Sequence, residues 1–267
     1  PVIDSNSDIT FVNSKSNKSA VTLLPIGALT VGSKGEDLAE LYDMNSAGAV
    51  AFYDYKKPIT NPNLMKIALQ YASNFGGWVC SFTQENNIAG QGVMNENITS
   101  TKLGLKGIPA LAEELQVARD LFLLEYTGGK LHIPTISTAS SVNLIRQAKQ
   151  KKLDVTCSVA IHNLYFTDDV LTDFNTIYKV LPPLRTQTDI DALIEGIKDG
   201  TIDMVTSDHN PIDIEHKKIE FDHAKYGSIG LESAFGALQS IFTLKKTIDI
   251  LTKGKSRFKI DPNSISV

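Results

Sequence analysis

Several features are scarce in this chain of 267 residues, and each scarcity excludes a class of protein. Its two cysteines, Cys80 and Cys157, form no CxxC pair, which argues against a structural zinc site. Both lie in apolar, strand-like runs, where we expect buried, reduced thiols of a cytoplasmic protein. No apolar run approaches the length of a membrane span and no signal peptide opens the chain, so we expect no membrane partner. A formal net charge of -4 supplies no basic stripe for nucleic acid.

The composition is that of a globular protein, with 42% hydrophobic and 21% charged residues. Six short runs rich in Val, Ile, Phe or Ala lack clean alternation, which is typical of parallel strands buried on both faces. They cover residues 21–29, 48–54, 78–82, 130–137, 154–160 and 204–207. Amphipathic stretches predict helices at 36–45, 62–74, 109–127, 140–151, 188–199 and 229–241.

Strands that alternate with helices predict an α/β fold with a parallel sheet. No linker divides the chain, so we expect one domain over residues 1–267. A closed barrel needs eight strands, and the pattern provides six. Either the sheet is open and doubly wound, or the other strands lie outside this sequence. Because the chain starts at Pro1 and stops at Val267 within polar sequence, we expect a piece of a longer chain.

Local signals set the expected helix limits and faces. Asn61 is the expected cap of the helix at 62–74, and Ser140 that of the helix at 140–151. Gly200 is the expected left-handed stop after 188–199. The buried face of the helix at 109–127 is expected to contain Leu111, Leu115, Ala118 and Leu121 or Phe122.

Two long segments, 83–108 and 161–185, follow expected strands and are candidate site walls. In parallel α/β folds the loops at the carboxyl ends of the strands build the active site.

The sharpest motif is Thr206-Ser-Asp-His-Asn-Pro. Its Asp208 suits a metal ligand, a general base or a cap of the following turn, and spacing alone favours the cap. The histidines form neither HxH nor HExxH. For His132 and His162 a satisfied core position is favoured over a shared site.

Several longer segments point to one family. They start at Gly107 (GIPALAEE), Ala118 (ARD), Lys130 (KLHIPTIST), Lys179 (KVLPPLR), Ala192 (ALIEGIKDGTID), Thr206 (TSDHNP) and Gly230 (GLESAF). Upstream, PVIDS, IGALT and GAVAF follow in the same order. Together these segments resemble dihydroorotase of the longer bacterial type, in the amidohydrolase superfamily, over essentially the whole chain.

The resemblance implies a TIM-type (β/α)8 metal-dependent-hydrolase barrel, here without its first strands and without the C-terminal strands of a small side domain. It also implies reversible cleavage of the cyclic amide of dihydroorotate in pyrimidine biosynthesis, with one or two zinc ions. In that family a metal-bound hydroxide would attack the ring carbonyl, and an aspartate after the last barrel strand would carry the proton. Asp208 matches that aspartate.

Departures from the family pattern fall on its metal ligands. The family's Asp-Asp-Gly reads Asp54-Tyr55-Lys56, so Tyr55 stands for the bridging carboxylate. Two histidine ligands fall on Phe82 and Thr135. Zinc needs nitrogen, thiolate or carboxylate donors, and Phe82 offers none. We therefore expect no metal in this chain.

The family's substrate contacts are also replaced. Its asparagine before Pro-Pro-Leu-Arg falls on Leu181, and the histidine that closes the Asp-His-x-Pro-His motif falls on Ile212. Asp208 is then the remnant of the catalytic set, and Phe82 and Leu181, in place of polar groups, are expected to make the pocket floor apolar.

These losses favour a pseudoenzyme that acts as a scaffold or regulatory partner. The resemblance suggests aspartate carbamoyltransferase as its partner, and we expect a homo-oligomer in the cytoplasm. The alternative is an active zinc-dependent dihydroorotase, or a related cyclic-amide hydrolase that interconverts dihydroorotate and carbamoyl aspartate. A third hypothesis is a protein that keeps the pocket for a small ligand without chemistry.

Overall fold

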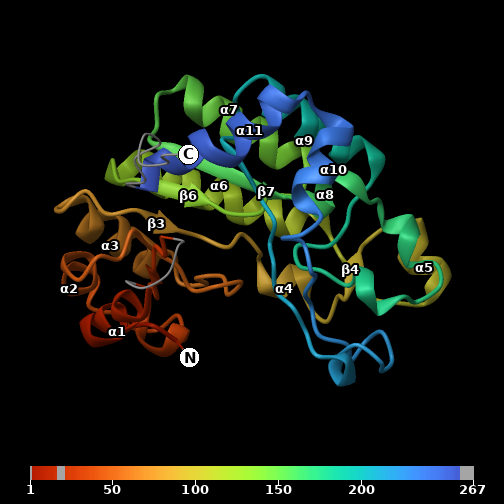
Figure 1. Ribbon diagram of the computed structural model, residues 1–267, viewed down its shortest axis with the longest axis horizontal. Helices are drawn as coiled ribbons and strands as arrows, with labels where there is room; N and C mark the ends of the chain where they lie inside the picture. Colours follow the sequence, from red (N-terminus) through yellow and green to blue (C-terminus); the bar gives the residue numbers. More distant parts are fainter. Residues whose placement is uncertain (1, 17–21, 259–267) are drawn as a thin grey trace.

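A sheet of six parallel strands forms the centre of the computed structural model, which describes residues 2–16 and 22–258 (Figure 1). The strand order is β1-β2-β3-β6-β7-β8. These strands are β1 (Ile26–Gly27), β2 (Ala51–Phe52), β3 (Val79–Cys80), β6 (Leu131–Ile133), β7 (Val155–Ala160) and β8 (Met204–Thr206). Each expected run contains one of them, so the predicted parallel α/β sheet is confirmed. Residue 21, the start of the first expected run, lies outside the described residues.

The segment 83–108 is more ordered than a surface connection. It contains a separate parallel pair, β4 (Met94–Asn95) and β5 (Gly107–Ile108), which the sequence did not predict. Two short helices, α4 (Asn86–Ala89) and α5 (Ile98–Leu103), lie in the same segment.

Eight further helices of the described residues lie outside the segment 83–108. They are α1 (Asn6–Ser16), α2 (Leu41–Ser46), α3 (Pro62–Ser73), α6 (Ala110–Thr127), α7 (Ala139–Gln150), α9 (Gln187–Lys198), α10 (Ala234–Ile241) and α11 (Leu244–Thr252). Helices α3, α6, α7 and α9 pack each against the next in sequence, as in a layer that follows successive crossovers (Figure 1). Helices α1 and α11 were not predicted. The structure also has α8 (Ile161–Tyr165) and 3-10 turns at Val31–Ser33, Asp168–Leu171, Thr176–Tyr178, Ile214–His216 and Lys253–Phe258.

Two expected helices begin several residues late. Helix α2 starts at Leu41 because the preceding segment pairs with the chain through a bridge between Thr30 and Leu38. Helix α10 starts at Ala234 because the chain at Gly230 passes close to Ser207. A Cβ at Gly230 would lie 2.1 Å from the Ser207 carbonyl oxygen, so this crossing requires glycine.

Of the three predicted helix-end signals, two were right and one was wrong. The Asn61 side chain accepts hydrogen bonds from the backbone N–H groups of Asn63 (3.0 Å) and Leu64 (3.3 Å), as expected. Helix α7 is capped by Thr138, not Ser140. The Thr138 hydroxyl accepts from the Ser141 N–H at 3.1 Å, which starts the helix one residue before the expected range. Gly200 has the expected left-handed backbone, with φ 82°.

The predicted buried face of α6 was wrong. Leu111, Leu115 and Phe122 are 54%, 47% and 70% exposed, and of the expected residues only Leu121 is buried. The buried face instead contains Glu113 and Asp120 among its apolar residues. Their carboxylates are satisfied by hydrogen bonds from the loop after β6 and from Ser81, so burial of these charges is compensated.

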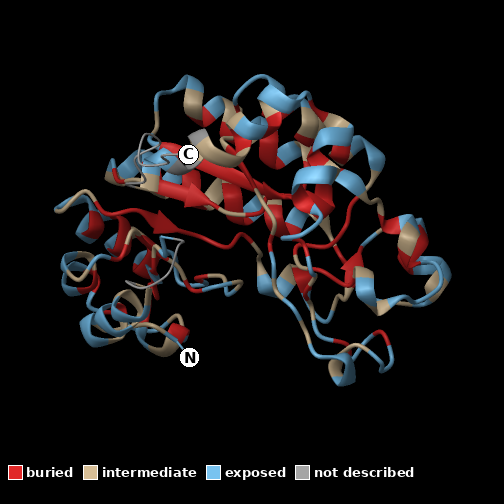
Figure 2. Cartoon of the chain, viewed as in Figure 1, coloured by how far each residue is buried: buried red, intermediate tan, exposed pale blue. Residues whose placement is uncertain are grey.

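The hydrophobic core lies between the sheet and these helices. Figure 2 shows the strands buried and the outward helix faces exposed. Cys80 and Cys157 are buried free cysteines, as expected. None of the helices within the described residues combines the length and apolar character that crossing a membrane requires.

Candidate active site at the carboxyl edge of the sheet

Asp208 lies just after β8, where its carboxylate is bound by side chains from the loop after β2. Its Oδ2 accepts from Lys56 Nζ at 2.7 Å, and its Oδ1 accepts from the Tyr55 hydroxyl at 3.4 Å. Its backbone N–H donates to the Thr206 hydroxyl at 3.2 Å. The prediction that Asp208 caps its own turn was therefore wrong, because the carboxylate bridges two strand ends that are far apart in sequence.

Lys56 is the site residue that sequence reasoning missed. Its ammonium group and the Asp208 carboxylate form an ion pair in which both side chains are largely buried. The available signal was the family's glycine at this position. Lys56 keeps the left-handed backbone that favours glycine, with φ 53°, and uses it to direct a cation to Asp208.

Tyr55 is half exposed and differs chemically from the carboxylate whose place it takes. Burial of its phenol, together with the nearby charge of Asp208, raises the Tyr55 pKa well above its ordinary value. The phenol therefore stays protonated and donates to Asp208. The preceding Asp54 has a structural role, because it accepts from the Leu29 and Thr30 N–H groups (2.9 and 3.0 Å) and from the Thr30 hydroxyl.

The two remaining family ligand positions offer little to a metal. Phe82 follows β3 and is buried, with no donor atom. Thr135 follows β6, and its buried Oγ1 has no hydrogen-bond partner. Within residues 2–16 and 22–258, no three His, Cys, Asp or Glu side chains gather as a metal site would require. The residues present thus do not fit the zinc site that the resemblance implies.

Backbone strain gathers at the same edge of the sheet. Lys56, Thr135 and Asp208 all have positive φ, at 53°, 51° and 44°. Such conformations cost about 1–3 kcal/mol for a residue other than glycine and concentrate at functional sites. The backbone of a site is therefore present although its side chains do not fit a metal.

The two candidate histidines have different surroundings. His132 is a satisfied core residue, because its Nδ1 lies 2.9 Å from the Thr156 hydroxyl and its Nε2 lies 3.3 Å from the Ser158 hydroxyl. His162 follows β7, with Nδ1 3.4 Å from the Ser228 hydroxyl and Nε2 3.9 Å from Asp208 Oδ2. Burial lowers the pKa of both imidazoles to about 3, so both are neutral near pH 7.

The two substrate positions are separated in the structure. Leu181 packs with Ala89, Ile108 and Ala112, in a small cluster under α6. Ile212 lines a cavity of about 680 Å³ beside His162. The segment 161–185 forms much of the wall of this cavity, as predicted.

The segment 83–108 contributes Gln84 and Asn86 to a smaller cavity of about 390 Å³, which Lys56 and Lys57 also line.

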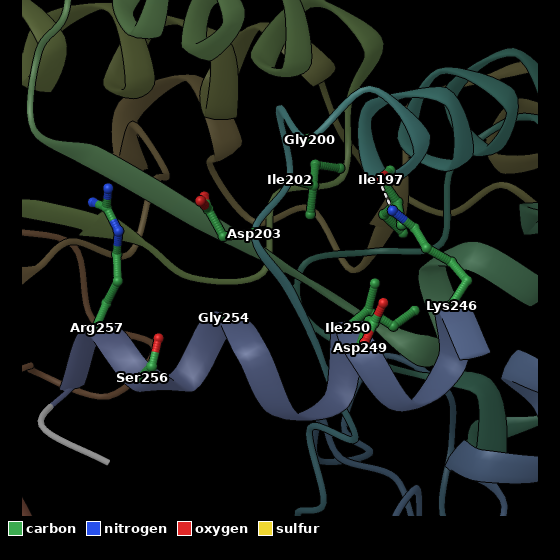
Figure 3. A pocket seen from close by; sticks show the side chains of 10 residues that line it. All are labelled: Ile197, Gly200, Ile202, Asp203, Lys246, Asp249, Ile250, Gly254, Ser256 and Arg257. Carbon is green, nitrogen blue, oxygen red and sulfur yellow. Dashed lines mark hydrogen bonds between the residues drawn. The ribbon is translucent and has the colours of Figure 1, made fainter. Parts of the chain in front are cut away.

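A further cavity of about 390 Å³ lies before β8, between that strand and α11 (Figure 3). Its charged groups already have partners. Lys246 donates to the Ile197 carbonyl at 2.8 Å, Asp203 pairs with Lys149 at 2.8 Å, and Arg257 pairs with Asp154 at 2.9 Å. This cavity lies at the amino end of the strand, where parallel barrels keep stability and not chemistry.

The chain is similar in sequence to proteins of one known family. The family model described as dihydro-orotase-like matches residues 4–141. A dihydroorotase of Pelotomaculum thermopropionicum is 50% identical over 236 residues, which are 88% of this chain and 55% of that protein. One from Caldanaerobacter subterraneus is 39% identical and matches 100% of this chain and 64% of its own length. The chain therefore spans little more than half the length of the curated relatives it matches.

Solved structures share the fold at low sequence identity. An L-hydantoinase from Arthrobacter aurescens matches with a TM-score of 0.80 and 20% identity, over 98% of this chain and 62% of its own. Dihydroorotase from Saccharomyces cerevisiae, in complex with 5-fluoroorotic acid, matches with a TM-score of 0.76 and 13% identity, over 97% and 74%. These matches confirm the predicted fold, a TIM-type α/β barrel, of which the described sheet has six strands.

Proposed function

This chain belongs to the dihydroorotase-like family. We propose that it is a non-catalytic member of that family, which serves pyrimidine biosynthesis as a scaffold or regulatory partner. The observation that carries the proposal is the 2.7 Å ion pair between Lys56 and Asp208. Asp208 matches the family's proton carrier. The Lys56 ammonium group donates a hydrogen bond to Asp208 Oδ2, so this oxygen is already engaged and is not free to accept a proton from a substrate.

The residues at the family's ligand positions support the same proposal. Tyr55 is protonated, Phe82 has no donor atom, and Thr135 offers a neutral hydroxyl. A metal ion held here would activate water as the nucleophile, and these three side chains offer it no good ligand.

An active zinc-dependent dihydroorotase is the second candidate. It is favoured by the curated relatives, which carry that name at up to 50% identity, and by the presence of Asp208.

Zinc content and turnover separate the two candidates. The full-length protein, purified without chelators and then supplied with zinc, is expected to hold close to no metal per chain. It should convert neither dihydroorotate nor carbamoyl aspartate, while a curated relative prepared in parallel does both. One or more tightly held zinc ions, together with turnover, would refute the non-catalytic proposal and establish the second candidate.

The partner assignment rests on the resemblance. We propose aspartate carbamoyltransferase as the partner and a homo-oligomer in the cytoplasm as the state of the protein. Co-purification from cells that express both proteins, followed by light scattering of the isolated complex, tests this assignment. Elution of the two proteins as separate species would exclude it.

A further inference from the structure

The cavity beside His162 is mostly apolar and has an aromatic wall. It lies between α8, α10 and the chain after β8, and Ile161, Leu184, Ile212 and Ile229 are among its lining residues. Its volume of about 680 Å³ is within the range of small-molecule sites.

Three aromatic side chains of the lining, Tyr165, Phe166 and Tyr178, contact one another. The Tyr165 and Phe166 ring centroids are 5.0 Å apart, and those of Phe166 and Tyr178 are 5.1 Å apart, both in edge-on geometry. Such a wall favours contact with another planar ring.

Part of the lining is polar. His162 and Ser228 are both in it, with a long contact of 3.4 Å between Nδ1 and Oγ. The buried His162 Nε2 has no hydrogen-bond partner, so the imidazole has unused hydrogen-bonding capacity. Ser228 also lines the cavity, and its hydroxyl can both donate a hydrogen bond to a ligand and accept one from it.

The charges near the cavity are already engaged. Asp208, the carboxylate nearest His162, is paired with Lys56. Lys217 lines the cavity, but its ammonium group donates to the carbonyl oxygens of Thr176 (2.9 Å) and Lys179 (3.2 Å), which holds the wall together. A charged ligand would lose hydration here without a free counter-ion, which disfavours it.

We propose that this cavity binds an uncharged, flat and mostly apolar molecule of one or two rings, with a single hydrogen-bonding group beside His162 and Ser228. The inference rests on the proposed function in one respect, because the molecule is held and not hydrolysed. It differs from the family's substrate class, which is anionic and polar.

Binding of 1-naphthol tests the proposal, since this probe has two fused rings and one hydroxyl group. Titration of the chain, followed by probe fluorescence and by calorimetry, should show saturable binding at one site. Naphthalene, which lacks the hydroxyl group, should bind at least about fivefold more weakly, and the Ser228→Ala variant should reduce that preference to below about twofold.

A variant that fills the cavity tests whether 1-naphthol binds there. Gly236 lines the cavity from α10, and no heavy atom lies within 4 Å of the place where a Cβ would stand, so Gly236→Phe adds a ring without a clash at the backbone. It should weaken 1-naphthol binding at least tenfold. Gln239→Phe, on the exposed side of the same helix, is the matched control and should change binding less than twofold.

Two results would overturn the inference: no saturable binding to the unaltered chain, or unchanged binding by Gly236→Phe. Ser240→Phe, from the same wall, replaces Gly236→Phe if circular dichroism shows that the first variant is unfolded. Dihydroorotate turnover is measured on the same samples. If the chain binds 1-naphthol at this cavity and also converts dihydroorotate, the proposed function is refuted and the cavity inference stands. If it neither binds 1-naphthol nor converts dihydroorotate, the cavity inference is refuted and the proposed function stands.

Discussion

The ion pair between Lys56 and Asp208 allows a quantitative prediction. At 2.7 Å, Coulomb's law with an effective dielectric constant of about 20 gives an attraction on the order of 6 kcal/mol. Desolvation of the two groups, whose side chains are 11% and 6% exposed, offsets most of it. Removing one partner is more costly than the net value of the pair, because the other charge stays buried. We therefore expect Lys56→Met to lower the free energy of unfolding by about 2–4 kcal/mol.

Two companion variants separate the effect of losing the Lys56 charge from the effect of the left-handed backbone at this position. Lys56→Gly also removes the cation but relieves the left-handed strain at φ 53°, so it should be about 1 kcal/mol less destabilising than Lys56→Met. Adding Asp208→Asn to Lys56→Met should recover about 1–2 kcal/mol, because the unpaired charge is gone.

Urea unfolding at neutral pH, followed by circular dichroism, measures these differences, with thermal midpoints expected to fall roughly 5–15 °C for Lys56→Met. Lys198→Met is the matched control, since Lys198 and its partner Glu195 are 56% and 65% exposed and 3.6 Å apart; it should cost less than about 0.5 kcal/mol. A Lys56→Met variant as stable as this control, or no recovery in the double variant, would refute the reasoning.

Three further predictions concern stability. Glu113→Ala should cost about 3 kcal/mol or more in urea unfolding, because its buried carboxylate accepts from the Ser137 hydroxyl and from the Ser137 and Thr138 N–H groups; an effect below 1 kcal/mol would contradict this. Burial holds the His132 pKa at about 3 in the folded chain, so the unfolded chain takes up the proton first as the pH falls. The free energy of unfolding should therefore decrease below about pH 6.5. The His132→Gln variant should lose less of it than the parent between about pH 7 and pH 5. Burial and the charge of Lys179 lower the Lys217 pKa to about 8, so stability should rise between about pH 8 and pH 10.5, and a Lys217→Met variant that kept this rise would exclude Lys217 as its source.

The sheet could be predicted from sequence because its signal is local. Runs such as Val155–Ala160 are apolar without alternation, and the alternation with helices gives their parallel direction. The resemblance supplied the barrel, which periodicity alone left undecided between open and closed.

The predictions that were wrong or missed depended on contacts between residues that are distant in sequence. The buried face of α6 follows Glu113 and Asp120, whose partners lie in other elements, so polarity alone gave the wrong face. The partner of Asp208 is 152 positions away in sequence, and no local pattern connects it to Lys56. The site positions Tyr55, Phe82, Thr135, Leu181 and Ile212 were located by resemblance, and their loss of function stays a prediction.

Thr135 makes the carboxyl edge of the sheet a target for protein engineering. It combines two unfavourable features, a β-branched side chain at φ 51° and a buried hydroxyl without a partner. Thr135→Gly removes both, and it should raise the melting temperature where most buried substitutions lower it. A chain that is easily improved at one buried position has not been selected there for maximal stability.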